Sequence, residues 1–93
     1  TVHKYSQYSS FEMNVFPNPA SREINISFNL DHASDVEVSL FDEMGRLVRD
    51  ISLGRKQEGA HSEEVDVSDL RPGIYYIRMK LGYASTTKPL VIQ

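Results

Sequence analysis

Hydrophobic and polar residues alternate most regularly over residues 23–30, where every second side chain is apolar. The apolar positions are Ile24, Ile26, Phe28 and Leu30. Successive side chains of a β-strand point to opposite faces of the sheet. This period of two therefore predicts a strand with one buried face and one solvated face.

A similar alternation recurs in six further segments, and residues that favour turns separate them. These segments cover residues 11–16, 35–41, 47–53, 60–67, 74–81 and 84–92. The first of them has the weakest pattern, so six or seven strands are expected. Strands spaced by about ten residues, without any segment of helical period, favour an all-β sandwich of two antiparallel sheets. A small closed barrel is the alternative that the same pattern leaves open.

Turn-forming residues indicate where consecutive strands reverse. Asp42 can accept hydrogen bonds from backbone N–H groups ahead of it, and Gly45 can take the positive φ of a hairpin bulge. The succession of Pro72 and Gly73 predicts a type II turn. A charged loop bounded by glycines is expected over residues 54–59.

The last two segments are predicted to form a hairpin that reverses at Gly82. The core-facing side chains of its first strand are expected to be Tyr75, Ile77, Met79 and Leu81. Pro89 has no N–H to donate to a neighbouring strand, so the last strand is predicted to lie at a sheet edge or to bulge there. An unpaired edge also suggests a homodimer formed through this strand.

Composition excludes several classes of function. The chain has 93 residues, the length of one domain, and its 40% hydrophobic content supports a single modest core. The formal net charge is −3 and the basic residues are scattered, which argues against nucleic-acid binding. The sequence has no cysteine, so disulfides and thiolate metal sites are excluded. No apolar run reaches the ~18 residues of a membrane helix.

The polar residues predict no catalytic centre, metal site or cofactor. His3, His32 and His61 are far apart in the sequence, and no nucleophile or acid stands at a recognised spacing from them. Carboxylates near predicted loops offer oxygen ligands for calcium, but their spacing matches no known calcium loop, and solvated faces explain them. These carboxylates belong to Asp31, Asp35, Glu63, Glu64 and Asp66.

Residues 1–10 are polar, without a sustained period, and are expected to be a linker from a preceding domain. The first residue is threonine rather than methionine, so we expect the chain to have been cut from a longer protein. Residues 11–93 are then predicted to form the folded domain, and any activity of the parent protein is expected to lie elsewhere.

Four short motifs follow one another in these residues. They are Phe16-Pro-Asn-Pro-Ala20, Val38-Ser-Leu-Phe-Asp-Glu-Met-Gly-Arg-Leu-Val48, Asp69-Leu-Arg-Pro-Gly-Ile-Tyr75 and Lys88-Pro-Leu-Val-Ile92. Each is weak alone. Together, in this order and at this spacing, they resemble the type A C-terminal sorting domain of type IX secretion system cargo, also called the Por secretion system domain. The resemblance covers about residues 11–93.

The resemblance implies a seven-stranded immunoglobulin-like sandwich in a cargo protein of a Gram-negative bacterium of the Bacteroidota type. It implies export to the periplasm and recognition of the folded domain by the outer-membrane translocon and its shuttle proteins. A sortase-like signal peptidase would then cut in the preceding linker. The cargo would be released or anchored at the cell surface, often through lipopolysaccharide, without direct membrane insertion of the domain.

By position, the resemblance assigns residues in all four motifs. The motif read by the translocon would be Lys88, Leu90, Val91 and Ile92. The mainly structural motif residues would be Pro17, Asn18, Pro19, Gly45, Arg46, Gly73 and Tyr75. Pro89 and Gln93 depart from the family, which often has a basic or aliphatic residue at the first position and lysine at the second.

Some of these residues also have structural roles that require no binding partner. A captured edge strand would gain affinity from main-chain hydrogen bonds and register from Lys88, but Lys88 would equally guard an exposed edge. Tyr75 is expected to be a core aromatic with a bonded hydroxyl, and Arg46 is either a solvated charge or a partner contact. The alternative function is a fibronectin-like accessory or carbohydrate-binding module of a secreted enzyme. Its aromatic platform would have to come from Tyr5, Tyr8, Tyr76 and Tyr83.

Overall fold

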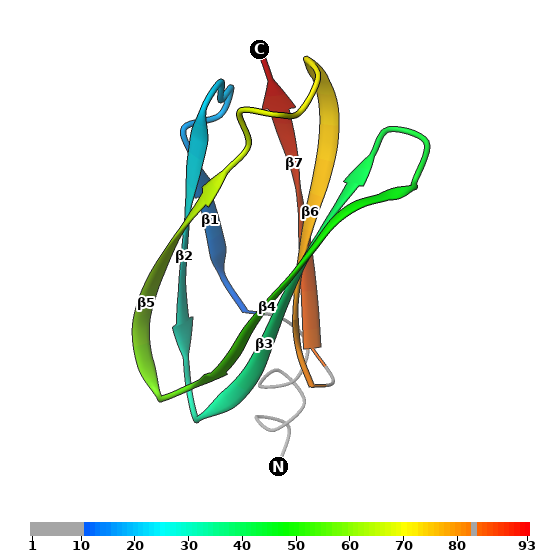
Figure 1. Ribbon diagram of the computed structural model, residues 1–93. Helices are drawn as coiled ribbons and strands as arrows, with labels where there is room; N and C mark the ends of the chain where they lie inside the picture. Colours follow the sequence, from blue (N-terminus) through cyan, green and yellow to red (C-terminus); the bar gives the residue numbers. More distant parts are fainter. Residues whose placement is uncertain (1–10, 83) are drawn as a thin grey trace.

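The computed structural model describes residues 11–82 and 84–93. The seven strands are β1 (Met13–Phe16), β2 (Glu23–Leu30), β3 (Ser34–Asp42), β4 (Leu47–Lys56), β5 (Gly59–Asp66), β6 (Gly73–Leu81) and β7 (Ala84–Ile92). They form a three-stranded sheet in the order β1-β2-β5 and a four-stranded sheet in the order β4-β3-β6-β7, both antiparallel (Figure 1). The predicted immunoglobulin-like sandwich is confirmed, and the closed-barrel alternative is wrong.

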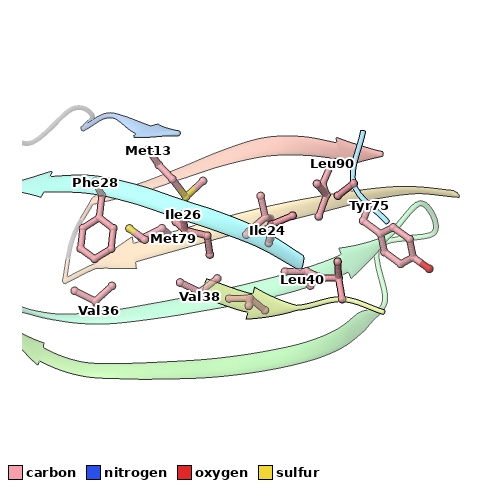
Figure 2. Packing of buried hydrophobic residues seen from close by; sticks show 14 of the residues in the cluster. Met13, Ile24, Ile26, Phe28, Val36, Val38, Leu40, Tyr75, Met79 and Leu90 are labelled. Atoms are coloured by element: carbon pink, nitrogen blue, oxygen red, sulfur yellow. The ribbon is translucent and has the colours of Figure 1, made fainter. Parts of the chain in front are cut away.

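The hydrophobic core lies between the inner faces of the two sheets (Figure 2). Its fully buried aliphatic side chains include Ile24, Ile26, Val36, Val38, Leu40 and Ile77. Each stands at the parity that the alternating pattern predicts for a buried face. Burial of each such side chain is worth roughly 1.5–3 kcal/mol, which makes these strands the main source of stability.

The order of the strands determines which of them lie at the edges of the two sheets. β3 lies between β4 and β6, while β7 is the last strand of its sheet. β1 is the last strand of the other sheet and lies in contact with β7 (Figure 1). One side of the sandwich is therefore formed by two edge strands, one from each sheet.

The loop predicted over residues 54–59 is shorter than expected. β4 continues past Gly54 as far as Lys56, and β5 already begins at Gly59. Gly54 has a φ of +77°, and the register of β4 against β3 shifts at this point. The glycine thus forms a bulge within a continuous strand rather than the start of a loop.

The type II turn predicted at residues 72–73 is wrong. The hydrogen-bonded turn comes earlier, where the Leu70 N–H donates to the Val67 carbonyl oxygen at 3.1 Å. Gly73 is the first residue of β6 and has a φ of +157°, far from the about +80° of that turn type. The proline there restrains φ without reversing the chain, because the chain has already turned.

Candidate functional site

The four sequence motifs come together at one end of the sandwich, around the end of β7 (Figure 1). Gly73 pairs with Ile92 across the β6–β7 ladder. Tyr75 pairs on its other side with Asp42, the residue that begins the hairpin turn. The segment after β1 joins them through a parallel bridge between Ala20 and Ile92. Motifs that are distant in the sequence thus form one continuous structure.

Asn18 ties the Pro-Asn-Pro segment to the last strand through both ends of its side-chain amide. Its Oδ1 accepts a hydrogen bond from the Val91 N–H at 2.9 Å, and its Nδ2 donates to the Pro89 carbonyl oxygen at 3.1 Å. The peptide bonds that precede Pro17 and Pro19 are both cis. The amide satisfies one donor and one acceptor on the outer edge of β7, as a neighbouring strand would.

Backbone hydrogen bonds extend this cover beyond the amide. The Ala20 N–H donates to the Val91 carbonyl oxygen and the Gln93 N–H donates to the Ala20 carbonyl oxygen, both at 2.8 Å. β7 is the last strand of its sheet, as expected, yet its outer edge is covered over residues 89–93. A partner that added a strand here would first have to displace the Ala20 segment.

The four residues of the predicted recognition motif divide into two buried and two exposed side chains. Leu90 and Ile92 belong to the core, and Leu90 lies within the cluster beside Tyr75 (Figure 2). Lys88 and Val91 are exposed. In the folded domain, only these two side chains of the motif are open to a partner.

Lys88 stands at a core-facing position of β7. It pairs with Ile77, which is fully buried, and residues opposite each other share one face of a sheet. Its side chain lines an open groove with Asn14, Val15 and Phe16 of β1. Lys88 thus stands between the two edge strands, where a charge also disfavours further strand pairing.

The turn between β3 and β4 is built around Asp42, as predicted. Its Oδ1 accepts hydrogen bonds from the N–H groups of Met44 and Arg46, both at 2.9 Å, and Gly45 takes a φ of +86°. The Arg46 Nε donates to the Asp42 Oδ2 at 2.9 Å, so the charge of Arg46 is paired even though its side chain is 78% exposed. These hydrogen bonds, first of all that from the Arg46 N–H, hold the pKa of Asp42 below its ordinary value of 3.8.

Tyr75 is a core aromatic with a bonded hydroxyl, as expected. The ring is buried, and its hydroxyl donates to the Arg71 carbonyl oxygen at 2.7 Å. Figure 2 shows the ring at the end of the cluster with its oxygen pointing away from it. Gly73 stands between these two residues and has a φ of +157°, which residues other than glycine rarely adopt.

An arginine joins the two sheets, which sequence reasoning did not foresee. Arg49 of β4 donates to the Asp66 carbonyl oxygen at 2.5 Å and to both carboxylate oxygens of Asp69 at 2.7 Å. The hydrogen bond from Arg49 is the main cause that lowers the pKa of Asp69, whereas the Ser68 hydroxyl and N–H lower that of Asp66. The only sign of this bridge in the sequence is that Arg49 stands at a position of β4 where the alternation expects an apolar side chain. The alternation does not show which groups Arg49 contacts.

Among the described residues, those considered for metal binding do not assemble. The described part of the chain holds no group of three or more His, Asp or Glu residues placed to bind a metal ion. His61 stacks on Phe28 with ring centroids 5.4 Å apart, and its Nε2 lies 2.6 Å from the Gln57 carbonyl oxygen. Among the same residues there is no helix long and apolar enough to cross a membrane. His3 lies outside the described residues.

Of the tyrosines considered for an aromatic platform, Tyr5, Tyr8 and Tyr83 lie outside the described residues. Tyr76 is described and is exposed on β6. The predicted linker, residues 1–10, also lies outside the described part of the chain.

The comparisons with known proteins bear on the same motifs. A search of curated proteins finds no match for the chain. The family model described as a secretion system C-terminal sorting domain matches residues 14–93. This match spans all four motifs and most of the chain. The chain therefore belongs to the family of type IX secretion system C-terminal sorting domains.

Proposed function

We propose that the type IX machinery reads this domain in its folded state, in the periplasm, and thereby exports the attached cargo through the outer membrane. The observation that supports the proposal is the meeting of the four family motifs at one end of the sandwich. Asn18 and Val91 are 73 positions apart in the sequence, yet they are joined by a hydrogen bond. An unfolded chain would present these motifs separately, whereas the folded domain presents them as one surface.

The division of the terminal motif suggests how recognition and folding are combined. Leu90 and Ile92 hold β7 in the core, so their role is to keep the strand in place. Lys88 and Val91 are exposed and are the side chains proposed to contact the translocon or its shuttle proteins. The Lys88 ammonium, beside β1, favours a partner that supplies an acidic group to the groove.

Cleavage of the linker and release or anchoring of the cargo follow recognition. A sortase-like signal peptidase cuts within or beside residues 1–10, and the cargo is released or anchored at the cell surface. The domain itself supplies a binding surface and takes no part in bond cleavage. The absence of catalytic activity stays a prediction, which assays of the isolated domain against the cargo's substrates would test.

The experiment is a fusion of residues 1–93 to a foreign reporter that is exported to the periplasm of a host with a working type IX system. We expect the reporter at the cell surface. Deletion of residues 88–93 should leave it in the periplasm, but this deletion also removes two core side chains. The double substitution Lys88→Ala and Val91→Ser therefore carries the sharper test, because both side chains are exposed.

Lys56→Ala is the control for the loss of a lysine charge at the other end of the sandwich, where Lys56 is ion-paired with Glu63 at 2.9 Å. Circular dichroism should show that both variants are folded. Undiminished surface display of the deletion would contradict the sorting function. Undiminished display of the double variant alone would contradict the roles given to Lys88 and Val91.

A further inference from the structure

The outer face of the four-stranded sheet carries an apolar row that crosses all four strands. From β4 to β7 the row is Leu47, Phe41, Tyr76 and Pro89, each paired with the next. Ile74 and its partner Val91 extend it toward the end of β7. The row lies on the outer face because the alternate positions Leu40, Ile77 and Leu90 are buried.

The row is open to solvent. Its large side chains Leu47, Ile74, Tyr76 and Val91 are between 38% and 54% exposed, and they are four of the seven large hydrophobic residues that are exposed in the described chain. The three-stranded sheet packs on the opposite face, and no described element covers this one (Figure 1). A contiguous apolar patch of this kind on a soluble domain marks an interaction site.

Charges of opposite sign lie beside the row, on different strands of the same face. Glu37 of β3 and Asp50 of β4 are acidic, whereas Arg78 and Lys80 of β6 are basic. Arg78 also lies over the ring of Phe41, with its guanidinium carbon 5.2 Å from the ring centroid. The face is thus acidic on β3, basic on β6 and apolar at the end near the hairpin turn, while Arg55 of β4 lies opposite Asp35 at the other end of the same face.

This pattern is complementary to itself. A two-fold axis that runs along the strands between β3 and β6 places β3 of one copy against β6 of another and keeps the apolar end against the apolar end. Phe41 then meets Tyr76 of the second copy, and Glu37 meets Lys80. Twisted sheets pack in this aligned way, with strand directions within about 30° of each other. A two-fold axis across the strands would instead set the apolar row against the charged end.

We propose that the outer face of the four-stranded sheet is a self-association surface and that its partner is a second copy of this chain. This goes beyond the sorting function and differs from the homodimer expected through the edge of β7, which is partly covered by the Ala20 segment. Four strands span about 19 Å. The contact is therefore at the small end of specific interfaces, where association is weak and transient.

Sedimentation equilibrium of the chain between about 10 µM and 1 mM tests the proposal. The wild-type chain should dimerise. Glu37→Lys and Lys80→Glu should each weaken homodimerisation by about tenfold or more, because each like-charge contact occurs twice in a symmetric dimer. An equimolar mixture of the two variants should recover association, since the lysines of one chain meet the glutamates of the other. Charge effects within a single chain cannot produce this recovery.

Two further substitutions test the apolar row. Tyr76→Ser should weaken association by about tenfold or more, whereas Phe16→Ser, which removes an exposed aromatic residue from β1 in the other sheet, should leave it unchanged. A wild-type chain that stays monomeric at 1 mM would overturn the proposal. Association that is indifferent to the charge reversals would also overturn it and would favour pairing through an edge strand. Circular dichroism of each variant excludes unfolding as the cause of a loss.

Discussion

Among single residues, Asn18 links the beginning of the domain to its end. Its amide makes one hydrogen bond to Val91 and another to Pro89. We expect Asn18→Ala to lower the free energy of unfolding by about 1–2 kcal/mol, because it leaves a backbone donor and a backbone acceptor of β7 without their partner. Urea denaturation measures this, with Asn14→Ala at an exposed site on β1 as the control. Equal stability of the two variants would contradict the role given to Asn18.

The lowered pKa of Asp42 predicts how the stability of the domain changes at acidic pH. The pKa of this residue is lower in the folded domain than in the unfolded chain, chiefly because the Arg46 N–H donates to its carboxylate. The unfolded chain therefore takes up this proton first, so the stabilisation is complete above the ordinary value of 3.8 and is lost as the pH falls through the folded pKa. Asp42→Asn should be less stable than the wild type at pH 5–7, and the difference should shrink below about pH 4.

Urea denaturation across this pH range measures that difference. Asp50→Asn, which removes a carboxylate from β4 in the same hairpin but leaves these hydrogen bonds in place, is the control. A gap between the wild type and Asp42→Asn that stays constant down to pH 2 would mean that the carboxylate is not held by these hydrogen bonds.

For whole elements, β7 combines two tasks on alternate residues. Leu90→Ala should lower the free energy of unfolding by about 2–5 kcal/mol, because it opens a cavity in the core. Val91→Ser, one residue further on the exposed face, should change stability by no more than about 0.5 kcal/mol. Denaturation measures both values, and a comparable loss from the two substitutions would contradict the assigned faces of the strand.

The alternating pattern predicted much of the fold because it reports which face of a strand is buried. Residues 23–30 became β2 with the expected inner side chains, and Tyr75 took its place in the core. The pattern carries no information on which distant groups meet. The Asn18 amide on β7 and the Arg49 bridge between the sheets depend on the assembled sandwich, so neither was predicted.

Local turn signals were less reliable where more than one geometry suits the same residue. Gly54 was expected to begin a loop, but its positive φ serves a bulge inside β4. The candidate site was predicted as a set of motif residues. Their meeting at one end of the sandwich, and the burial of Leu90 and Ile92, followed only from the sheet order.

For the molecule as a whole, the buried cluster takes its side chains from both sheets of the sandwich. Every residue of the buried cluster lies between Met13 and Ile92, and no buried polar or charged side chain occurs among the described residues. We therefore expect the chain to unfold in a single transition whose midpoint changes by no more than about 2 °C when a stable carrier protein is fused before residue 1. Calorimetry of the free and fused chains measures this, with the carrier alone as the control.

A larger rise in the midpoint would mean that the preceding domain packs on the sandwich, and the signal would then depend on its cargo. An unchanged midpoint would mean that the same folded surface is presented whatever cargo precedes it, which is what a sorting signal requires.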